Sequence, residues 1–160
     1  MLTVKIIAVG RLREKHYISA FEEYLKRLSP LCKIESLELS EKRIGDNPSK
    51  SEINSALLFE GDMISKHIPK GAYVISMCVE GKSVSSEDFA DMLKSLAVKG
   101  YSKLCFIIGG SCGLSENIKK LSDYRLSMSE MTLPHHLARV MLAEQIYRGF
   151  MINENTKYHK

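Results

Sequence analysis

The sequence predicts an α/β fold with a mostly parallel sheet and helices on both faces. The first observation is that short aliphatic segments at 2–9, 72–79 and 104–108 lack polar alternation, as strands buried on both faces do. The second is that segments with helical spacing separate them, and such alternation is typical of parallel sheets. At 160 residues and 44% hydrophobic, the chain suits a single compact domain over 1–160.

The N-terminal half alternates strand and helix in order. After the strand at 2–9, aromatic and leucine side chains at helical spacing predict a helix over 17–28. The segment 33–39 alternates more and is expected to be a fourth strand. Residues 40–50, with a glycine, an asparagine and a proline, predict a longish mobile loop.

Two further helices begin at recognisable caps. Ser49 with Glu52, and Ser85 with Asp88, have the spacing at which a hydroxyl and a carboxylate satisfy each other's free amides. Helices near 50–67 and 86–98 are therefore expected. Because ligands of parallel sheets bind outside the carboxyl ends of the strands, the strand ends are where a site is expected.

Charge and cysteine content narrow the function classes. The 23 basic and 19 acidic residues give a net charge of +4, which permits contact with a polyanion without establishing it. The four cysteines lack CxxC spacing, as in a reduced protein. No apolar stretch reaches the roughly 18 residues that span a bilayer, and the opening one is too short for a secretion signal. We expect a cytoplasmic protein with no membrane association.

The strand at 104–108 ends in the glycine-rich turn 109–113, GGSCG. Missing β-carbons let the backbone turn tightly and bring its amides close to a ligand, so the turn is a candidate cofactor floor. Its spacing matches neither the GxGxxG of dinucleotide folds nor a P-loop, which disfavours NAD and ATP. Taken alone, the cluster favours an ordinary turn from strand to helix.

A proline-led helix is predicted after the short apolar stretch 124–128 and the segment Ser129 to Pro134. From 135 to 151, apolar residues occupy most of the helix circumference, so burial on two sides is needed. Its own sheet can cover one side and a partner subunit the other, which predicts a two-fold homodimer. Glu144 can pair with Arg148. Arg139 has no such partner and is either a surface or interface arginine or a contact to phosphate or base.

The adjacent histidines His135 and His136 open this helix. Neighbouring side chains diverge by about 100° on a helix, and neither histidine has another ligand at metal-binding spacing. No metal site is expected, and the two histidines are expected to cap the helix or line the rim of a site.

Three parts of the chain together resemble the SPOUT trefoil-knot methyltransferases. They are the strand followed by GGSCG, the block LSMSEMTLPHHLARVMLAEQIYRGF at 126–150, and the YHK end. Within them the chain resembles the RlmH family, which methylates N3 of a pseudouridine in large-subunit ribosomal RNA. The likeness runs from the KIIAVGRLREK opening to the last residue. It implies S-adenosylmethionine as cofactor and a C-terminal trefoil knot, which general topology rules would not predict.

The resemblance also implies which residues contact the cofactor. They are Met77, Gly109, Met128, Ser129, Glu130, Met131, Thr132 and Leu133. Met77 stands where the family often has leucine, and the contact made by Glu130 stays open because lysine or another residue can occur there. Lys160 stands where some relatives have arginine, which keeps the charge but loses bidentate geometry.

Methyl transfer from a sulfonium depends mainly on holding donor and acceptor in line and needs no metal. The acceptor nitrogen must also lose a proton, which a nearby cation could assist. The candidates are Arg139, His135 and His159. Tyr158, His159 and Lys160, together with Arg139, are candidate RNA contacts. The tail of one subunit could complete the site of the other; otherwise it is a frayed terminus.

The expected partner is the assembled ribosome and its large-subunit RNA, because a charge of +4 makes docking on naked RNA weak. The basic residues Lys5, Arg11, Arg13 and Lys15 are either RNA contacts or a solvated loop. Two alternatives remain open: a transfer-RNA methyltransferase of the same fold, and a non-enzymatic nucleotide-binding α/β module whose glycine turn cradles an anion.

Overall fold

Strands and helices alternate along the whole chain, and the computed structural model describes all 160 residues. The elements are β1 Thr3–Val9, α1 Lys15–Leu28, β2 Lys33–Leu39, α2 Lys50–His67, β3 Tyr73–Ser83, α3 Ser86–Val98, β4 Lys103–Ile108, α4 Glu116–Leu121, β5 Tyr124–Ser127 and α5 His135–Asn153. The predicted strands and helices are all confirmed. None of the helices combines the length and hydropathy that a membrane crossing requires.

The five strands form one sheet in the order β2-β1-β4-β3-β5, and every neighbouring pair is parallel. The prediction of a mostly parallel sheet is confirmed. The central strand β4 is fully buried from Leu104 to Ile107, as its unbroken apolar sequence predicted.

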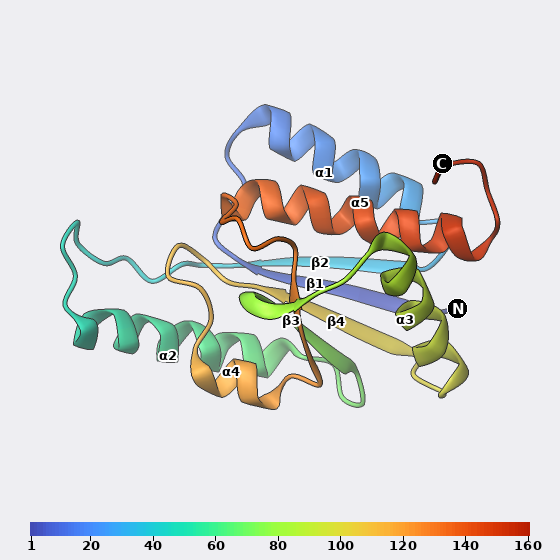
Figure 1. Ribbon diagram of the computed structural model, residues 1–160. Helices are drawn as coiled ribbons and strands as arrows, with labels where there is room; N and C mark the ends of the chain where they lie inside the picture. Colours follow the sequence, from blue (N-terminus) through green and yellow to red (C-terminus); the bar gives the residue numbers. More distant parts are fainter.

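Helices cover both faces of the sheet, again as predicted (Figure 1). One face packs against α1, α3 and α5 through residues such as Ile6, Phe106 and Ile146. The other packs against α2 and α4 through Ile7 and Ile118. Successive residues of β1 therefore serve opposite cores, because side chains alternate across a strand.

Serine caps open the helices where the sequence predicted them. Ser49 Oγ accepts a hydrogen bond from the Glu52 amide at 3.1 Å, and Ser85 Oγ one from the Asp88 amide at 3.0 Å. A third cap, in which Ser115 accepts from the Ile118 amide at 3.3 Å, opens α4. The sequence analysis did not identify α4, because a helix of six residues is too short to show a periodic pattern.

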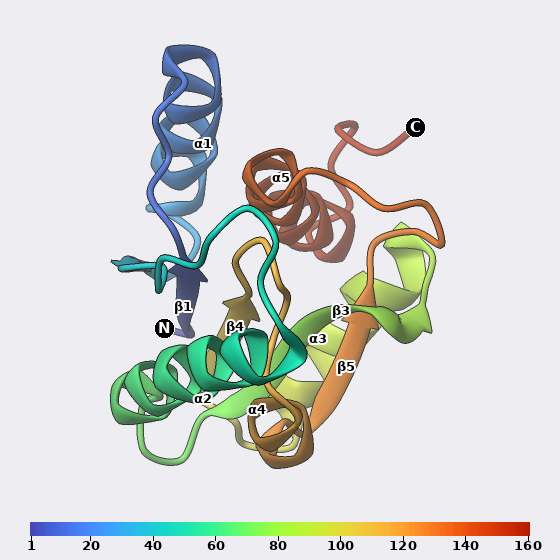
Figure 2. The same cartoon turned by 90° about the vertical axis from the view of Figure 1, so that its left-hand side faces the viewer.

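The apolar circumference of α5 is largely covered within the chain itself. This helix lies between α1 and α3 on its face of the sheet (Figure 2). At Gly149, an added β-carbon would lie 2.8 Å from Leu93 Cδ1, so α3 approaches the helix closely. The flanking helices therefore supply part of the burial that α5 requires. Apolar side chains such as Val140, Met141 and Tyr147 stay partly exposed, and the homodimer stays a prediction.

After β5, the chain turns from the α4 face toward the α5 face at the carboxyl edge of the sheet. β5 pairs with the outer side of β3, and the next segment leads directly into α5 (Figure 2). The segment 128–134 therefore lies beside the carboxyl ends of β3 and β4. The trefoil knot itself stays a prediction.

Candidate functional site

A cavity of about 700 Å³ lies at the carboxyl edge of the sheet, where the sequence placed the candidate site. Its walls come mainly from the end of β3, the glycine turn after β4, and the segment from Ser127 into the start of α5, and Lys119 of α4 completes them. Pockets for small ligands commonly measure about 300–1,000 Å³. The cavity is therefore large enough for a nucleoside-sized cofactor.

Seven of the eight residues expected to contact the cofactor line this cavity. They are Met77, Gly109, Met128, Ser129, Met131, Thr132 and Leu133. The eighth, Glu130, is exposed and does not line it. The structure thus brings together stretches of the chain that are separated by up to 56 positions, from Met77 to Leu133.

The glycine turn requires glycine for its own packing. A β-carbon at Gly109 would lie 2.3 Å from the carbonyl oxygen of Gly113, and Gly113 has a φ of +81°. The Gly113 amide donates to the Gly110 carbonyl at 3.1 Å, which closes the turn. The turn is therefore both a tight connection to α4 and a wall of the cavity, so the two interpretations of the sequence are compatible.

Glu41, in the loop between β2 and α2, holds this turn in place. Its Oε1 accepts hydrogen bonds from the Ser111 amide at 2.8 Å and the Ser111 hydroxyl at 2.5 Å. Partial burial raises the pKa of Glu41, but the bonds from Ser111 and the nearby His135 outweigh it, so the pKa is lower than usual. No local sequence pattern predicts this contact, because the partners are 70 positions apart.

A bulge in β3 forms the opposite wall. Leu126 of β5 pairs with both Met77 and Lys82, so the residues between them leave the sheet and border the cavity. Val79 in this bulge is 54% exposed and Met131 is 78% exposed. Apolar side chains left exposed in a concave site commonly mark a ligand surface.

An ion pair between Lys119 and Glu80 lies in the lining of the cavity. The hydrogen bond from Lys119 lowers the pKa of Glu80. Neither residue was predicted to belong to the site, because Glu80 lies in the bulge and Lys119 in the short α4. A cation at this position can serve an anionic group of a ligand.

His135 is a rim residue, as one interpretation predicted. It lines this cavity and a second, more polar one beside it. Burial and the neighbouring His136 lower the pKa of His135, which favours a neutral imidazole at neutral pH. The two imidazole centroids lie 4.2 Å apart. No group of three or more histidine, cysteine or acidic side chains is placed to hold a metal ion.

Arg139 is not a surface arginine, and that expectation was wrong. It is 1% exposed and donates hydrogen bonds to Glu38 Oε2 at 2.5 Å and to the Gly10 carbonyl at 2.9 Å. Its partner Glu38 could not be predicted from the sequence, because it lies 101 positions away on β2. In this arrangement the guanidinium joins α5 to the ends of β1 and β2 and lines neither cavity.

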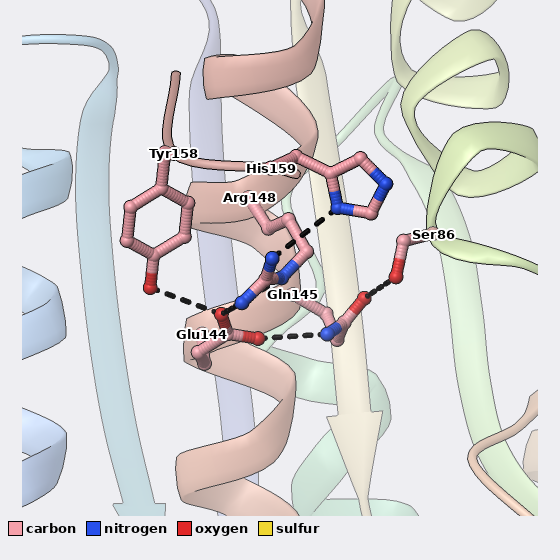
Figure 3. Close-up of polar contacts among 6 residues, drawn as sticks. All are labelled: Ser86, Glu144, Gln145, Arg148, Tyr158 and His159. Carbon is pink, nitrogen blue, oxygen red and sulfur yellow. Dashed lines mark hydrogen bonds and ion pairs between the residues drawn. The ribbon is translucent and has the colours of Figure 1, made fainter. Parts of the chain in front are cut away.

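The C-terminal tail packs against the middle of α5 (Figure 3). The Tyr158 hydroxyl donates to Glu144 at 3.0 Å, and His159 lies 3.2 Å from Arg148 and 2.9 Å from Glu87. Burial and the bonds to Tyr24 and Glu144 raise the pKa of Tyr158. Of the predicted tail contacts, only Lys160 is exposed. The tail is therefore docked rather than frayed.

No residue of the docked tail lines the cavity of its own chain. Glu144 follows His135 by nine positions on α5, which corresponds to roughly 13 Å along a helix. The predicted catalytic residues are thus not gathered at one point: His135 borders the cavity, Arg139 is buried behind it, and His159 is held further along α5.

Comparison with known proteins identifies the fold and the family. A family model described as "Predicted SPOUT methyltransferase" matches residues 2–159. The chain belongs to the SPOUT methyltransferases. Among curated relatives, "Ribosomal RNA large subunit methyltransferase H" of Oenococcus oeni is 45% identical over 160 residues and covers 100% of both chains. The relative of the same name from Leuconostoc mesenteroides is 43% identical over 99% of this chain and 100% of its own.

Solved SPOUT-like structures support the fold at low sequence identity. A probable methylase family protein from Haemophilus influenzae aligns with a TM-score of 0.55 at 13% identity, over 98% of this chain and 70% of its own. A tRNA (m1G37) methyltransferase from Aquifex aeolicus aligns with a TM-score of 0.54 at 14% identity, over 91% of this chain and 69% of its own. At this identity the likeness concerns the fold alone.

Proposed function

We propose that this SPOUT methyltransferase transfers a methyl group from S-adenosylmethionine to N3 of a pseudouridine in large-subunit ribosomal RNA, on assembled ribosomes in the cytoplasm. The observation that carries the proposal is full-length similarity, at 43–45% identity, to relatives named as large-subunit ribosomal RNA methyltransferases. The cavity at the strand ends supports it, because seven residues expected from the sequence to contact the cofactor lie together there.

The lining residues fit the chemical parts of S-adenosylmethionine. Apolar side chains at Met77, Val79 and Leu133 offer a surface for the adenine ring, and the space kept open by Gly109 admits a ligand close to the backbone. Lys119 offers a cation for the methionine carboxylate. Bound there, S-adenosylmethionine would supply the methyl group to a nucleophilic nitrogen.

His135 is our first candidate for the group that accepts the proton from the acceptor nitrogen. A neutral imidazole can accept a proton, and the low pKa of His135 keeps that form populated at neutral pH. Arg139 is held by Glu38 and Gly10, so we assign it a positioning role: it ties the N-terminal half of α5, which carries His135, to the strand ends.

We further propose a homodimer in which the tail of one subunit completes the site of the other. His159 is held more than two helical turns from the cavity of its own chain, so reaching an acceptor there requires another chain or release of the tail. Mixing subunits changed at Gly109 with subunits changed at His159 tests this. Restored transfer is expected, since a mixed dimer keeps one intact cofactor site facing one intact tail, and no restoration would contradict the dimer arrangement.

Incubation with labelled S-adenosylmethionine tests the substrate. Purified ribosomes, free subunits and transfer RNA are offered separately, and label is expected in large-subunit RNA. Label found only in transfer RNA would show that transfer RNA, and not large-subunit RNA, is the substrate. Calorimetry tests the enzyme class: failure to bind S-adenosylmethionine, with binding of a nucleotide instead, would favour a non-enzymatic nucleotide-binding module.

A further inference from the structure

A second cavity, of about 810 Å³, lies beside the first at the same edge of the sheet. The loops after β1 and β2 and the start of α5 form it, and His135 borders both cavities. Gly10, with a φ of +98°, makes the turn at its base, where an added β-carbon would lie 3.5 Å from Glu41 Oε2 and 3.8 Å from His135 Nε2. A ligand in the second cavity would therefore lie next to the proposed cofactor.

The carboxylates of this second cavity are already engaged by the protein. Glu38 accepts hydrogen bonds from the Leu12 amide and from Arg139. Glu41 accepts from Ser111, and Glu14 lies 3.2 Å from His136 Nδ1. None of these side chains has an arginine of the cavity as its partner.

The guanidinium groups of the second cavity are, by contrast, free. Arg11, Arg13 and Arg43 are exposed and line it, and none of the three forms a side-chain hydrogen bond or an ion pair within the chain. Arg139 compensates the charge of Glu38, so the three free guanidinium groups outnumber the two carboxylate charges that remain, those of Glu14 and Glu41, and the cavity can attract anions. The remaining titratable neighbours are His135 and His136.

A planar guanidinium offers paired donors that match the oxygens of a phosphate, and arginine is weakly hydrated enough to be desolvated there. A nucleotide accepting a methyl group must reach the first cavity, so the phosphates on either side of it must pass close by. The second cavity, which shares His135, is the adjoining concave surface with free cations.

We propose that the cavity formed by the loops after β1 and β2 binds the phosphate backbone of the RNA strand flanking the acceptor nucleotide, through Arg11, Arg13 and Arg43. This inference rests on the proposed function. It assigns the RNA path across the chain to the loops after β1 and β2, beside His135. The contacts carry no sequence preference, because they reach phosphates rather than bases.

The test compares two double variants of equal charge. Arg11→Ala with Arg13→Ala removes two cations from the second cavity. Lys94→Ala with Lys99→Ala removes two exposed cations, one on α3 and one at its C-terminal cap. Binding of a uridine homopolymer and of ribosomes is measured at several salt concentrations, with polyglutamate as an acidic peptide of matched charge.

The arginine variant is expected to bind the homopolymer and ribosomes at least tenfold more weakly than the lysine variant. The slope of log affinity against log salt should shrink by about 0.7 for each single-strand phosphate contact removed. Equal binding by the two variants, or polyglutamate binding the unchanged protein as well as RNA does, would overturn the proposal.

Failure of the proposed function would look different. If the unchanged protein binds RNA through these arginines but neither binds S-adenosylmethionine nor transfers a methyl group, the phosphate site stands and the methyltransferase assignment falls. If the unchanged protein transfers the methyl group and the arginine variant binds and reacts like the lysine variant, the assignment stands and the phosphate site falls.

Discussion

The two cavities at the carboxyl edge share His135 but differ in the polarity of their lining side chains. The first has glycine backbone, methionine, valine and leucine in its walls, with one lysine paired to a glutamate. The second is lined almost entirely by polar and charged side chains, with Leu39 as its apolar member. The first suits a flat, mostly apolar ligand, and the second suits a polyanion.

On the proposed function, the difference separates a donor side from an acceptor side along one edge of the sheet. The donor side is formed by the ends of β3 and β4 with the segment before α5, and the acceptor side by the ends of β1 and β2. Glu41 belongs to both, since it lines the second cavity and holds Ser111 of the first.

The largest effect is expected from Gly109→Ala. Its β-carbon would lie 2.3 Å from the backbone of Gly113, so the turn must shift, and cofactor affinity measured by calorimetry should fall at least about 100-fold. In Gly110→Ala, the nearest atoms to the added β-carbon belong to the movable side chain of Glu41, so this variant should lose less cofactor affinity. Gly45→Ala, with no atom within 4 Å, is the control. Undiminished affinity in folded Gly109→Ala protein would contradict the assignment of the first cavity.

His159→Ala is expected to lower methyl transfer by about 100-fold while leaving cofactor affinity unchanged, because the tail does not touch the cofactor cavity of its own chain. Lys157→Ala, an exposed neighbour in the same tail, is the matched control. Initial rates and calorimetry measure the two quantities separately. An equal loss of cofactor affinity would show that the tail belongs to the donor side instead.

Arg139→Met should destabilise the fold by about 2 kcal/mol, since it leaves Glu38 and the Gly10 carbonyl without their buried donor. Urea unfolding measures this effect. Arg27→Met removes an exposed pair with Glu23 and should cost less than about 1 kcal/mol. If the two substitutions cost the same, Arg139 does not hold the acceptor side to α5.

The smallest effect is expected from Glu41→Gln. The amide keeps the shape but accepts weaker hydrogen bonds from Ser111, so cofactor affinity should fall by about fivefold. Glu14→Gln, which alters only the second cavity, should leave cofactor affinity unchanged. Equal affinity in the two variants would show that the glycine turn keeps its shape without Glu41.

Much of this arrangement could be predicted from the sequence. Strand β4 is an unbroken apolar segment, and local hydrogen bonds of Ser49 and Ser85 mark helix starts, so these elements are visible in short stretches. The cofactor residues were expected through family resemblance, with Glu130 falling outside the cavity.

The remaining features depend on contacts between distant positions. Glu38 with Arg139 and Glu41 with Ser111 join residues 101 and 70 positions apart, and no local pattern encodes such pairs. The second cavity was not predicted: the basic cluster of undecided role included Arg11 and Arg13, which line it, but not Arg43. The phosphate-binding role could be proposed only from the structure, which shows which carboxylates are engaged and which arginines are free.

The most direct test of the central claim is the mass of the pseudouridine-containing fragments of large-subunit RNA from cells lacking this protein. The account predicts that one pseudouridine nucleotide lacks the mass of a single methyl group, and that incubating those ribosomes with the protein and S-adenosylmethionine restores it. An unchanged mass in large-subunit RNA, with a methyl group missing from a transfer RNA instead, would contradict the account.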